Sequence, residues 1–244
     1  MSDPKTSQLH IATSSERKSD LYRAVLSAAG IPVIYRHLET DLKLDRLDEQ
    51  HIDLHVLAQK KLDHALKEVK QYPFFVEQSG LAIEVWNGLP GGLSDVFFGQ
   101  NLGCYIVCQM LSAFGSEVRA TVQTIIHYVV ARNKVWTREH EFSGLIASSP
   151  RGDGWGWERI FIPDGTTSTL GELTHADKCR LLATNGPAVV LKEYWESQHA
   201  AADSASKSPG IHIVGDGNIL QFATGTGNAL AADRSSSETK TGKT

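Results

Sequence analysis

Features that mark several specialised protein classes are scarce in this chain of 244 residues. It has only three cysteines, Cys104, Cys108 and Cys179, and so small and odd a number argues against a disulfide framework. No apolar run reaches the roughly 18 residues that a membrane-spanning helix needs. The N-terminus also lacks the basic-then-apolar pattern of a signal peptide. We therefore expect a cytoplasmic protein with no membrane partner.

Positive charge is not in excess either. Lysine and arginine number 24 against 28 aspartates and glutamates, which gives a net charge of -4. Nucleic-acid-binding domains usually present a basic surface to the phosphate backbone, so we expect no nucleic-acid partner. The hydrophobic fraction of 41% is ordinary for a globular protein, and the length allows one sizeable domain with an appendage.

The N-terminal part of the chain predicts the start of an α/β fold. Residues 9–12 are typical of a strand, residues 16–29 carry apolar side chains at helical spacing, and residues 33–35 are typical of a second strand. The turn between the first strand and the helix contains Thr13, Ser15 and Lys18. Hydroxyls and a lysine at a helix N-terminus suit a phosphate group, while simple helix capping is the alternative.

Further along, a helix is predicted over residues 53–69, and a buried helix over residues 100–114. For the second helix we expect Leu102, Tyr105, Ile106, Met110 and Leu111 to face the core. Cys104 and Cys108 share one face of it, where two buried thiols are favoured over a metal site. Two β-branched runs, residues 118–131 and 135–146, predict a long hairpin.

Two further segments contain the residues of greatest chemical interest. Residues 74–76 predict a short strand, which the polar cluster Glu77 to Gly80 interrupts before a second apolar strand begins. Such a cluster is expected where a sheet edge opens onto a cleft. Residues 151–161 are rich in glycine and contain Trp155 and Trp157, which could stack on a base or only anchor a loop.

The order of these segments resembles the family of inosine and xanthosine triphosphate pyrophosphatases. That family carries Val-Glu-Asp-Ser-Gly-Leu where this chain has residues 76–81, and Ala-Thr-x-Asn-x-x-Lys where it has residues 12–18. Its Gly-Phe-Gly-(Tyr/Trp)-Asp motif resembles residues 154–158, and its Thr-x-Ala-Glu-Leu and Glu-Lys motifs resemble residues 169–173 and 177–178. The resemblance spans roughly residues 8–197.

This resemblance implies an α/β fold with an elongated mixed central sheet flanked by helices, and a nucleotide cleft between two lobes. It implies hydrolysis of a nucleoside triphosphate to a monophosphate and pyrophosphate. Carboxylates would hold Mg²⁺ and lysines would neutralise the phosphates. It also implies a homodimer.

Carried over residue by residue, the resemblance assigns catalytic roles to Glu77, Gln78 and Lys18, and metal binding to Glu77 and Glu158. The residues assigned to nucleotide binding are Thr13, Ser15, Lys18, Lys61, Ser79, Trp155, Trp157, Lys178 and Thr184. Asp95 is a further carboxylate that we expect across the cleft.

Several positions depart from the family pattern. Gln78 stands where the family has an aspartate, and an amide is neither a strong Mg²⁺ ligand nor a general base. The metal-binding glutamate of the family aligns with Val56, or with His55 after a shift of one residue. Where the family has Ser-His-Arg, which recognises the purine 6-keto group, this chain has residues 182–184, Leu-Ala-Thr. We therefore expect low activity and relaxed or altered base preference.

Three hypotheses follow for the function. The chain is a pyrophosphatase with a rebuilt site, a homologue that binds a nucleotide or a partner without catalysis, or an enzyme that acts on another phosphorylated substrate. We expect the pyrophosphatase-like domain over residues 1–199, a linker with a possible hairpin over residues 200–232, and a disordered tail over residues 233–244.

Overall fold

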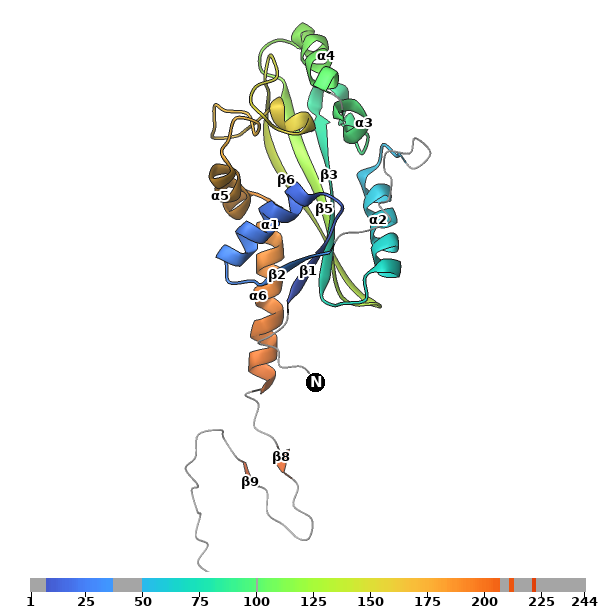
Figure 1. Ribbon diagram of the computed structural model, residues 1–244, viewed down its shortest axis with the longest axis vertical. Coiled ribbons are helices and arrows are strands. Elements are labelled where there is room, and N and C mark those ends of the chain that lie inside the picture. Colours follow the sequence, from blue (N-terminus) through green and yellow to red (C-terminus); the bar gives the residue numbers. More distant parts are fainter. Residues whose placement is uncertain (1–7, 37–49, 100, 207–210, 213–220, 223–244) are drawn as a thin grey trace, which may run out of the picture. The chain divides into compact units, whose positions relative to one another are not determined.

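The computed structural model describes residues 8–36, 50–99, 101–206, 211–212 and 221–222 (Figure 1). The chain divides into two compact units, Met1–Ser197 and Gln198–Thr244. In the described part of the chain, no helix combines the length and the apolar character that crossing a membrane requires.

The first unit contains one mixed sheet with the strand order β2-β1-β3-β5-β6-β7, and β4 pairs with β3 at the side. β1 is parallel to β2 and β3, whereas β3, β5, β6 and β7 pair antiparallel in succession. This confirms the predicted mixed α/β fold. The strands are β1 (Leu9–Ala12), β2 (Val33–Arg36), β3 (Phe74–Ile83), β4 (Pro90–Gly91), β5 (Arg119–Ala131), β6 (Lys134–Ile146) and β7 (Phe161–Pro163).

Helices cover both faces of this sheet. The predicted helices near the N-terminus and after Asp53 are confirmed, and each begins at a polar cap, Ser15 and Asp53. The α-helices are α1 (Glu16–Ala28), α2 (Leu54–Glu68), α3 (Ser94–Phe98), α4 (Asn101–Leu111), α5 (His175–Asn185) and α6 (Pro187–Ser206). Short 3₁₀ turns are η2 (Glu84–Trp86), η3 (Ser112–Phe114) and η4 (Gly156–Arg159).

β3 is one continuous strand, so the prediction of two strands separated by a polar interruption is wrong. Its residues pair one by one with β5, from Phe74 opposite Val129 to Ile83 opposite Ala120. On its other edge, β1 pairs only with residues 74–75 and β4 only with residues 81–82. In the described chain, no strand covers this edge between those two pairings. The polar residues therefore lie mid-strand, beside an open stretch of sheet edge.

Two separate apolar clusters cover one face of the sheet. Side chains of α1 and α6 pack on one half, around Leu26, Phe75 and Leu191, while α4, η4 and β7 pack on the other half, around Val107 and Phe161. α2 packs on the opposite face of the sheet, as Figure 1 also shows. Between the two clusters, polar side chains of β3 and β5 line a cleft, and the candidate site lies there.

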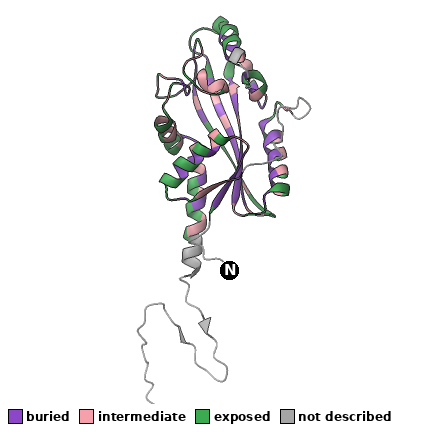
Figure 2. Ribbon diagram, viewed as in Figure 1, coloured by how far each residue is buried: buried purple, intermediate pink, exposed green. Residues whose placement is uncertain are grey.

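α4 carries both buried and exposed residues (Figure 2). Leu111 is buried as predicted, together with Cys104 and Cys108, whereas Tyr105, Ile106 and Met110, which were also expected to face the core, are exposed. α4 carries apolar side chains of its own on every face, so the periodicity of its sequence could not identify the buried face. The two thiols donate to the carbonyl oxygens of Gly156 and Ala147, which supports their role as buried packing residues.

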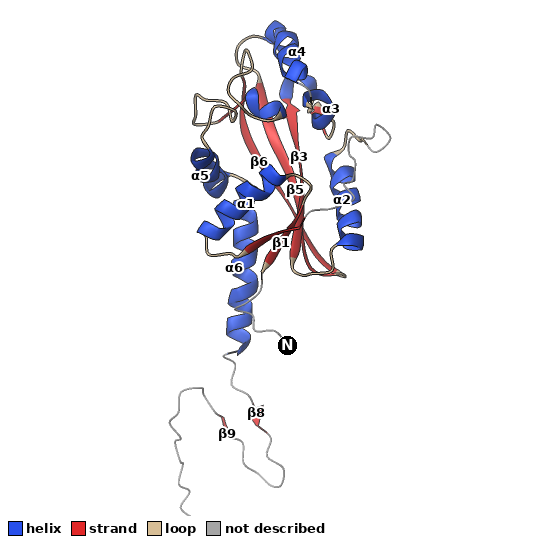
Figure 3. Ribbon diagram, in the orientation of Figure 1, coloured by secondary structure: helices blue, strands red, loops and turns tan. Residues whose placement is uncertain are grey.

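The second unit contains the end of α6 and a short pair of strands. α6 runs through Ser206, so the segment predicted as a linker from Ala200 begins as helix (Figure 3). β8 (Ile211–His212) pairs antiparallel with β9 (Gln221–Phe222), in agreement with the predicted hairpin. The residues between these two strands and the tail predicted from Asp233 lie outside the described residues.

Candidate nucleotide-binding cleft

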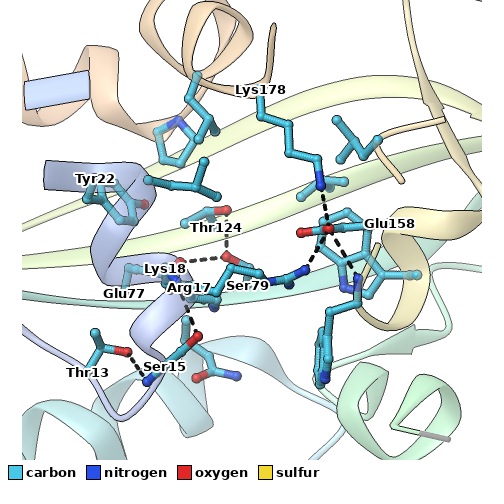
Figure 4. Close-up of a pocket in the computed structure, with 18 of the residues that line it drawn as sticks. Thr13, Ser15, Arg17, Lys18, Tyr22, Glu77, Ser79, Thr124, Glu158 and Lys178 are labelled. Carbon is cyan, nitrogen blue, oxygen red and sulfur yellow. Dashed lines mark hydrogen bonds and ion pairs between the residues drawn. The ribbon is translucent and has the colours of Figure 1, made fainter. Parts of the chain in front are cut away.

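A cleft of about 700 Å³ opens between the two apolar clusters. β3 and β5 supply polar side chains to it, α1, α2 and α5 supply cations, and the turn around η4 supplies two indole rings (Figure 4). The sequence-predicted residues that line it are Thr13, Ser15, Lys18, Lys61, Glu77, Gln78, Ser79, Asp95, Trp155, Trp157, Glu158 and Lys178.

Glu77 lies in the middle of β3 with its carboxylate almost fully buried. Lys18 Nζ of α1 is 2.6 Å from Glu77 Oε1, and Ser79 Oγ donates to Glu77 Oε2 at 2.6 Å. Burial acts to raise the pKa of Glu77, but the charges of Lys18 and Lys61 outweigh it, so this pKa lies below its usual value. Burial likewise acts to lower the pKa of Lys18, and the carboxylate of Glu77 raises it overall.

The open edge of β3 is occupied by a lysine. Lys61, buried in α2, donates from Nζ to the backbone oxygen of Glu77 at 2.8 Å. Strand alternation places Glu77 and Ser79 on the α1 face of the sheet and Gln78 on the α2 face. Gln78 and Lys61 nonetheless line the cleft, because no strand covers β3 at this point in the described chain.

The hydroxyls of the turn before α1 have local structural roles. Thr13 Oγ1 accepts from the backbone N–H of Ser15, and Ser15 Oγ accepts from that of Lys18. Helix capping, the alternative from the sequence, therefore accounts for both hydroxyls in the absence of a ligand. Because both residues also line the cleft, capping and phosphate binding are compatible at this turn.

The other end of the cleft is built around Glu158 in η4. Its Oε2 atom accepts from Arg17 Nη1 at 2.8 Å, from Lys178 Nζ at 3.1 Å and from the backbone N–H of Trp155 at 3.2 Å. The guanidinium of Arg17 also lies 5.8 Å from the centre of the Trp155 ring, within cation–π range. Sequence analysis missed Arg17; its position in the first turn of α1, beside Lys18, was the available signal.

Some predicted positions are not brought to this cleft. Thr184 does not line it, and its hydroxyl donates instead to the backbone oxygens of Arg180 and Leu181 within α5. Val56 and His55, the positions aligned with the family's metal-binding glutamate, do not line it either. The wall near α5 is formed by apolar residues, among them Leu181, Leu182 and Pro187.

Comparison with known proteins identifies the family. The model of the Ham1 family matches residues 9–184. This chain belongs to the Ham1 family. A protein of Korarchaeum cryptofilum named dITP/XTP pyrophosphatase is 33% identical over 162 residues, which cover 66% of this chain and 82% of that one. The inosine triphosphate pyrophosphatase of Kluyveromyces lactis is 29% identical over 154 residues, or 62% of this chain and 78% of that one.

Solved structures of Ham1 proteins share this fold. The Staphylococcus aureus Ham1 protein has a TM-score of 0.61 at 18% identity, covering 79% of this chain and all of that one. A HAM1 protein from Coxiella burnetii has a TM-score of 0.59 at 22% identity, covering 81% of this chain and 98% of that one. The family and fold expected from the sequence motifs are therefore confirmed.

Enzymes of the Ham1 family generally use Mg²⁺, so the carboxylates of the cleft must be tested as ligands. Among the described residues, no group of three His, Cys, Asp or Glu side chains is placed to hold a metal ion. Glu77 and Glu158, the two predicted ligands, each form ion pairs with lysine. These residues do not form a dedicated Mg²⁺ cage; they are compatible with an ion that arrives on the phosphates of a nucleotide.

Proposed function

We propose that this protein binds a nucleoside triphosphate in the cleft and hydrolyses it, at a low rate, to a nucleoside monophosphate and pyrophosphate. One observation carries the proposal: Lys18, Lys61 and Lys178, from three different helices, line one cleft together with the indoles of Trp155 and Trp157. Cations suit the phosphate chain and the indoles suit a base. The names of the curated relatives point to the same chemistry.

In this proposal the N-terminus of α1, with Lys18 and Lys61, binds the phosphate chain. A water oxygen attacks the α-phosphorus. The bond from that phosphorus to the oxygen that bridges the α- and β-phosphorus atoms breaks, and pyrophosphate leaves. The amide of Gln78 cannot take the proton of the water. Glu77 is ionised near neutral pH, but its lowered pKa makes it a weak base, so we expect slow turnover. Mg²⁺ bound to the phosphates would neutralise charge on the leaving group.

The second candidate function is nucleotide binding without turnover. Gln78 and Glu77 also favour this second function. Gln78 carries no charge, and the carboxylate of Glu77 already pairs with Lys18 and accepts a hydrogen bond from Ser79. An aspartate at position 78 would restore a carboxylate on the open edge of β3. General-base catalysis typically contributes about 10² to 10⁴ in rate.

The test is an assay of pyrophosphate release from a panel of nucleoside triphosphates with Mg²⁺, alongside calorimetric measurement of binding. We expect binding and slow release by the natural protein, and a rise of at least about tenfold with Gln78→Asp. Gln109→Asp, an exposed position on α4, is the matched control and should change neither quantity. Binding with no release by either protein would favour the second function, and the absence of all nucleotide binding would refute both.

A further inference from the structure

Three segments far apart in the sequence meet at a single carboxylate oxygen. Arg17 comes from α1, Lys178 from α5, and the backbone N–H of Trp155 from the turn before η4, and all three donate to Oε2 of Glu158. The side chains of Lys178 and Glu158 are largely enclosed, at 15% and 13% exposure, while that of Arg17 is 40% exposed. Figure 4 shows the side chain of Lys178 pointing toward Glu158, to which a dashed line joins it.

This arrangement leaves three of the four lysines and arginines that line the cleft paired with the protein's own carboxylates. Lys18 pairs with Glu77, and Arg17 and Lys178 pair with Glu158. A nucleoside triphosphate carries several negative charges and needs cations with which to pair. When it enters, either the carboxylates stay and repel it, or one of them gives up its partners.

We infer that Glu158 is an internal competitor of the phosphate chain: it occupies Arg17 and Lys178 in the empty cleft and must release them to the nucleotide. Arg17 is thereby a further phosphate-binding residue of the cleft. The inference rests on the proposed nucleotide-binding function, and it assigns to Glu158 the opposite effect from a metal ligand, since its carboxylate weakens nucleotide binding.

The local structure allows Glu158 to leave its partners. It lies in a four-residue 3₁₀ turn, and Gly156 in this turn has a φ of 51°, a conformation that glycine adopts readily. Glu77, by contrast, lies in a strand paired with a neighbour along its whole length. When Glu158 withdraws, the face of the Trp155 ring still holds the guanidinium of Arg17 at the cleft.

Whether Glu158→Gln strengthens or weakens nucleotide binding distinguishes this role from the alternatives. If Glu158 held a metal ion or contacted the base, Glu158→Gln would weaken nucleotide binding. If it competes with the phosphate chain, the same change removes one negative charge and strengthens binding. Glutamine keeps an oxygen that can accept from the N–H of Trp155, so the turn itself is preserved.

The experiment compares the natural protein with Glu158→Gln by isothermal titration calorimetry, using ATP, ITP, inorganic triphosphate and inosine as probes. We expect about tenfold tighter binding of the three phosphate-bearing probes, from the loss of one partly screened like charge, and no change for inosine. The gain should shrink as salt is raised. Asp164→Asn is the matched control, because it removes a carboxylate paired with Arg119 at 2.8 Å on an exposed surface.

A double-mutant cycle adds a readout that a purely structural role would not change. In the natural protein, Arg17 must leave Glu158 before it can bind phosphate, so Arg17→Gln should weaken triphosphate binding only about threefold. In the Glu158→Gln background, Arg17 is already released, and the same substitution should cost about tenfold. Equal losses in both backgrounds would overturn the competition between Glu158 and phosphate for Arg17.

The remaining outcomes separate this inference from the function on which it rests. Nucleotide binding that Glu158→Gln leaves unchanged or weakens overturns the inference and leaves the proposed function standing. A gain seen with inosine but not with inorganic triphosphate also overturns it. If neither protein binds any of the phosphate-bearing probes, the proposed function and the inference both fail.

Discussion

The two ends of the cleft use the same arrangement of charges in different surroundings. At each end a glutamate forms an ion pair with a cation from α1: Glu77 with Lys18, and Glu158 with Arg17. At each end a further lysine lies against the same residue, Lys61 on the backbone oxygen of Glu77 and Lys178 on the carboxylate of Glu158. What differs is burial, since Glu77 is inside a sheet and Glu158 is in a turn at the wall of the cleft.

This difference decides what each charge cluster can do. The carboxylate of Glu77 is almost fully buried in a strand that is paired along its whole length, so it cannot move away from Lys18 and the Glu77 cluster is a fixed part of the fold. Glu158 lies on a short turn and pairs with Arg17, whose side chain is 40% exposed, so its ion pairs can exchange with those of a ligand at lower cost. Similar charge patterns can therefore stabilise a fold at one end of a cleft and regulate binding at the other.

The largest expected effect is on stability. Glu77→Gln removes the buried carboxylate that faces Lys18 and Lys61, and we expect it to lower the free energy of unfolding by about 3 kcal/mol. Glu158→Gln should lower it by less than about 1 kcal/mol, because the Arg17 side chain with which it pairs is 40% exposed. Urea denaturation of the three proteins measures both values. Equal losses would show that burial does not separate the two clusters.

A second, smaller effect concerns acid. The pKa of Glu77 is lowered in the folded protein by Lys18 and Lys61, so folding favours its ionised form. The resulting stability is fully present above the unfolded value of 4.5 and is lost as pH falls through the lower, folded value. Unfolding free energies measured from pH 7 to pH 3 should therefore fall less steeply in Glu77→Gln. Parallel curves would contradict this assignment.

The smallest expected effect is on the choice of base. Ala183 and Thr184 stand where the family pattern has the His and Arg that recognise a 6-keto group, and neither residue lines the cleft. Without such partners, the wall formed by Leu181 and Leu182 discriminates weakly between purines. We expect kcat/KM for ITP, ATP and GTP to agree within about tenfold. A hundredfold preference for ITP would contradict this expectation.

Sequence reasoning succeeded where local pattern and motif order agree. The strand, turn and helix at the N-terminus and the long hairpin of β5 and β6 were predicted close to their observed bounds. The motifs identified the family and half of the residues that line the cleft. It failed at β3, where polar residues were taken as a break, and at α4, where apolar residues on every side hid the buried face.

The sequence by itself determined the elements and the chemical types available to the site, because helical periodicity, caps and glycine-rich turns are local properties. Only the tertiary structure decided which charges pair. Arg17 and Glu158 are 141 positions apart in sequence, and their contact depends on how α1 and η4 pack against the sheet. Polar residues can lie within a continuous strand when a neighbouring strand pairs with their backbone and their side chains line a cleft. Whether that happens depends on distant segments, which no local pattern encodes.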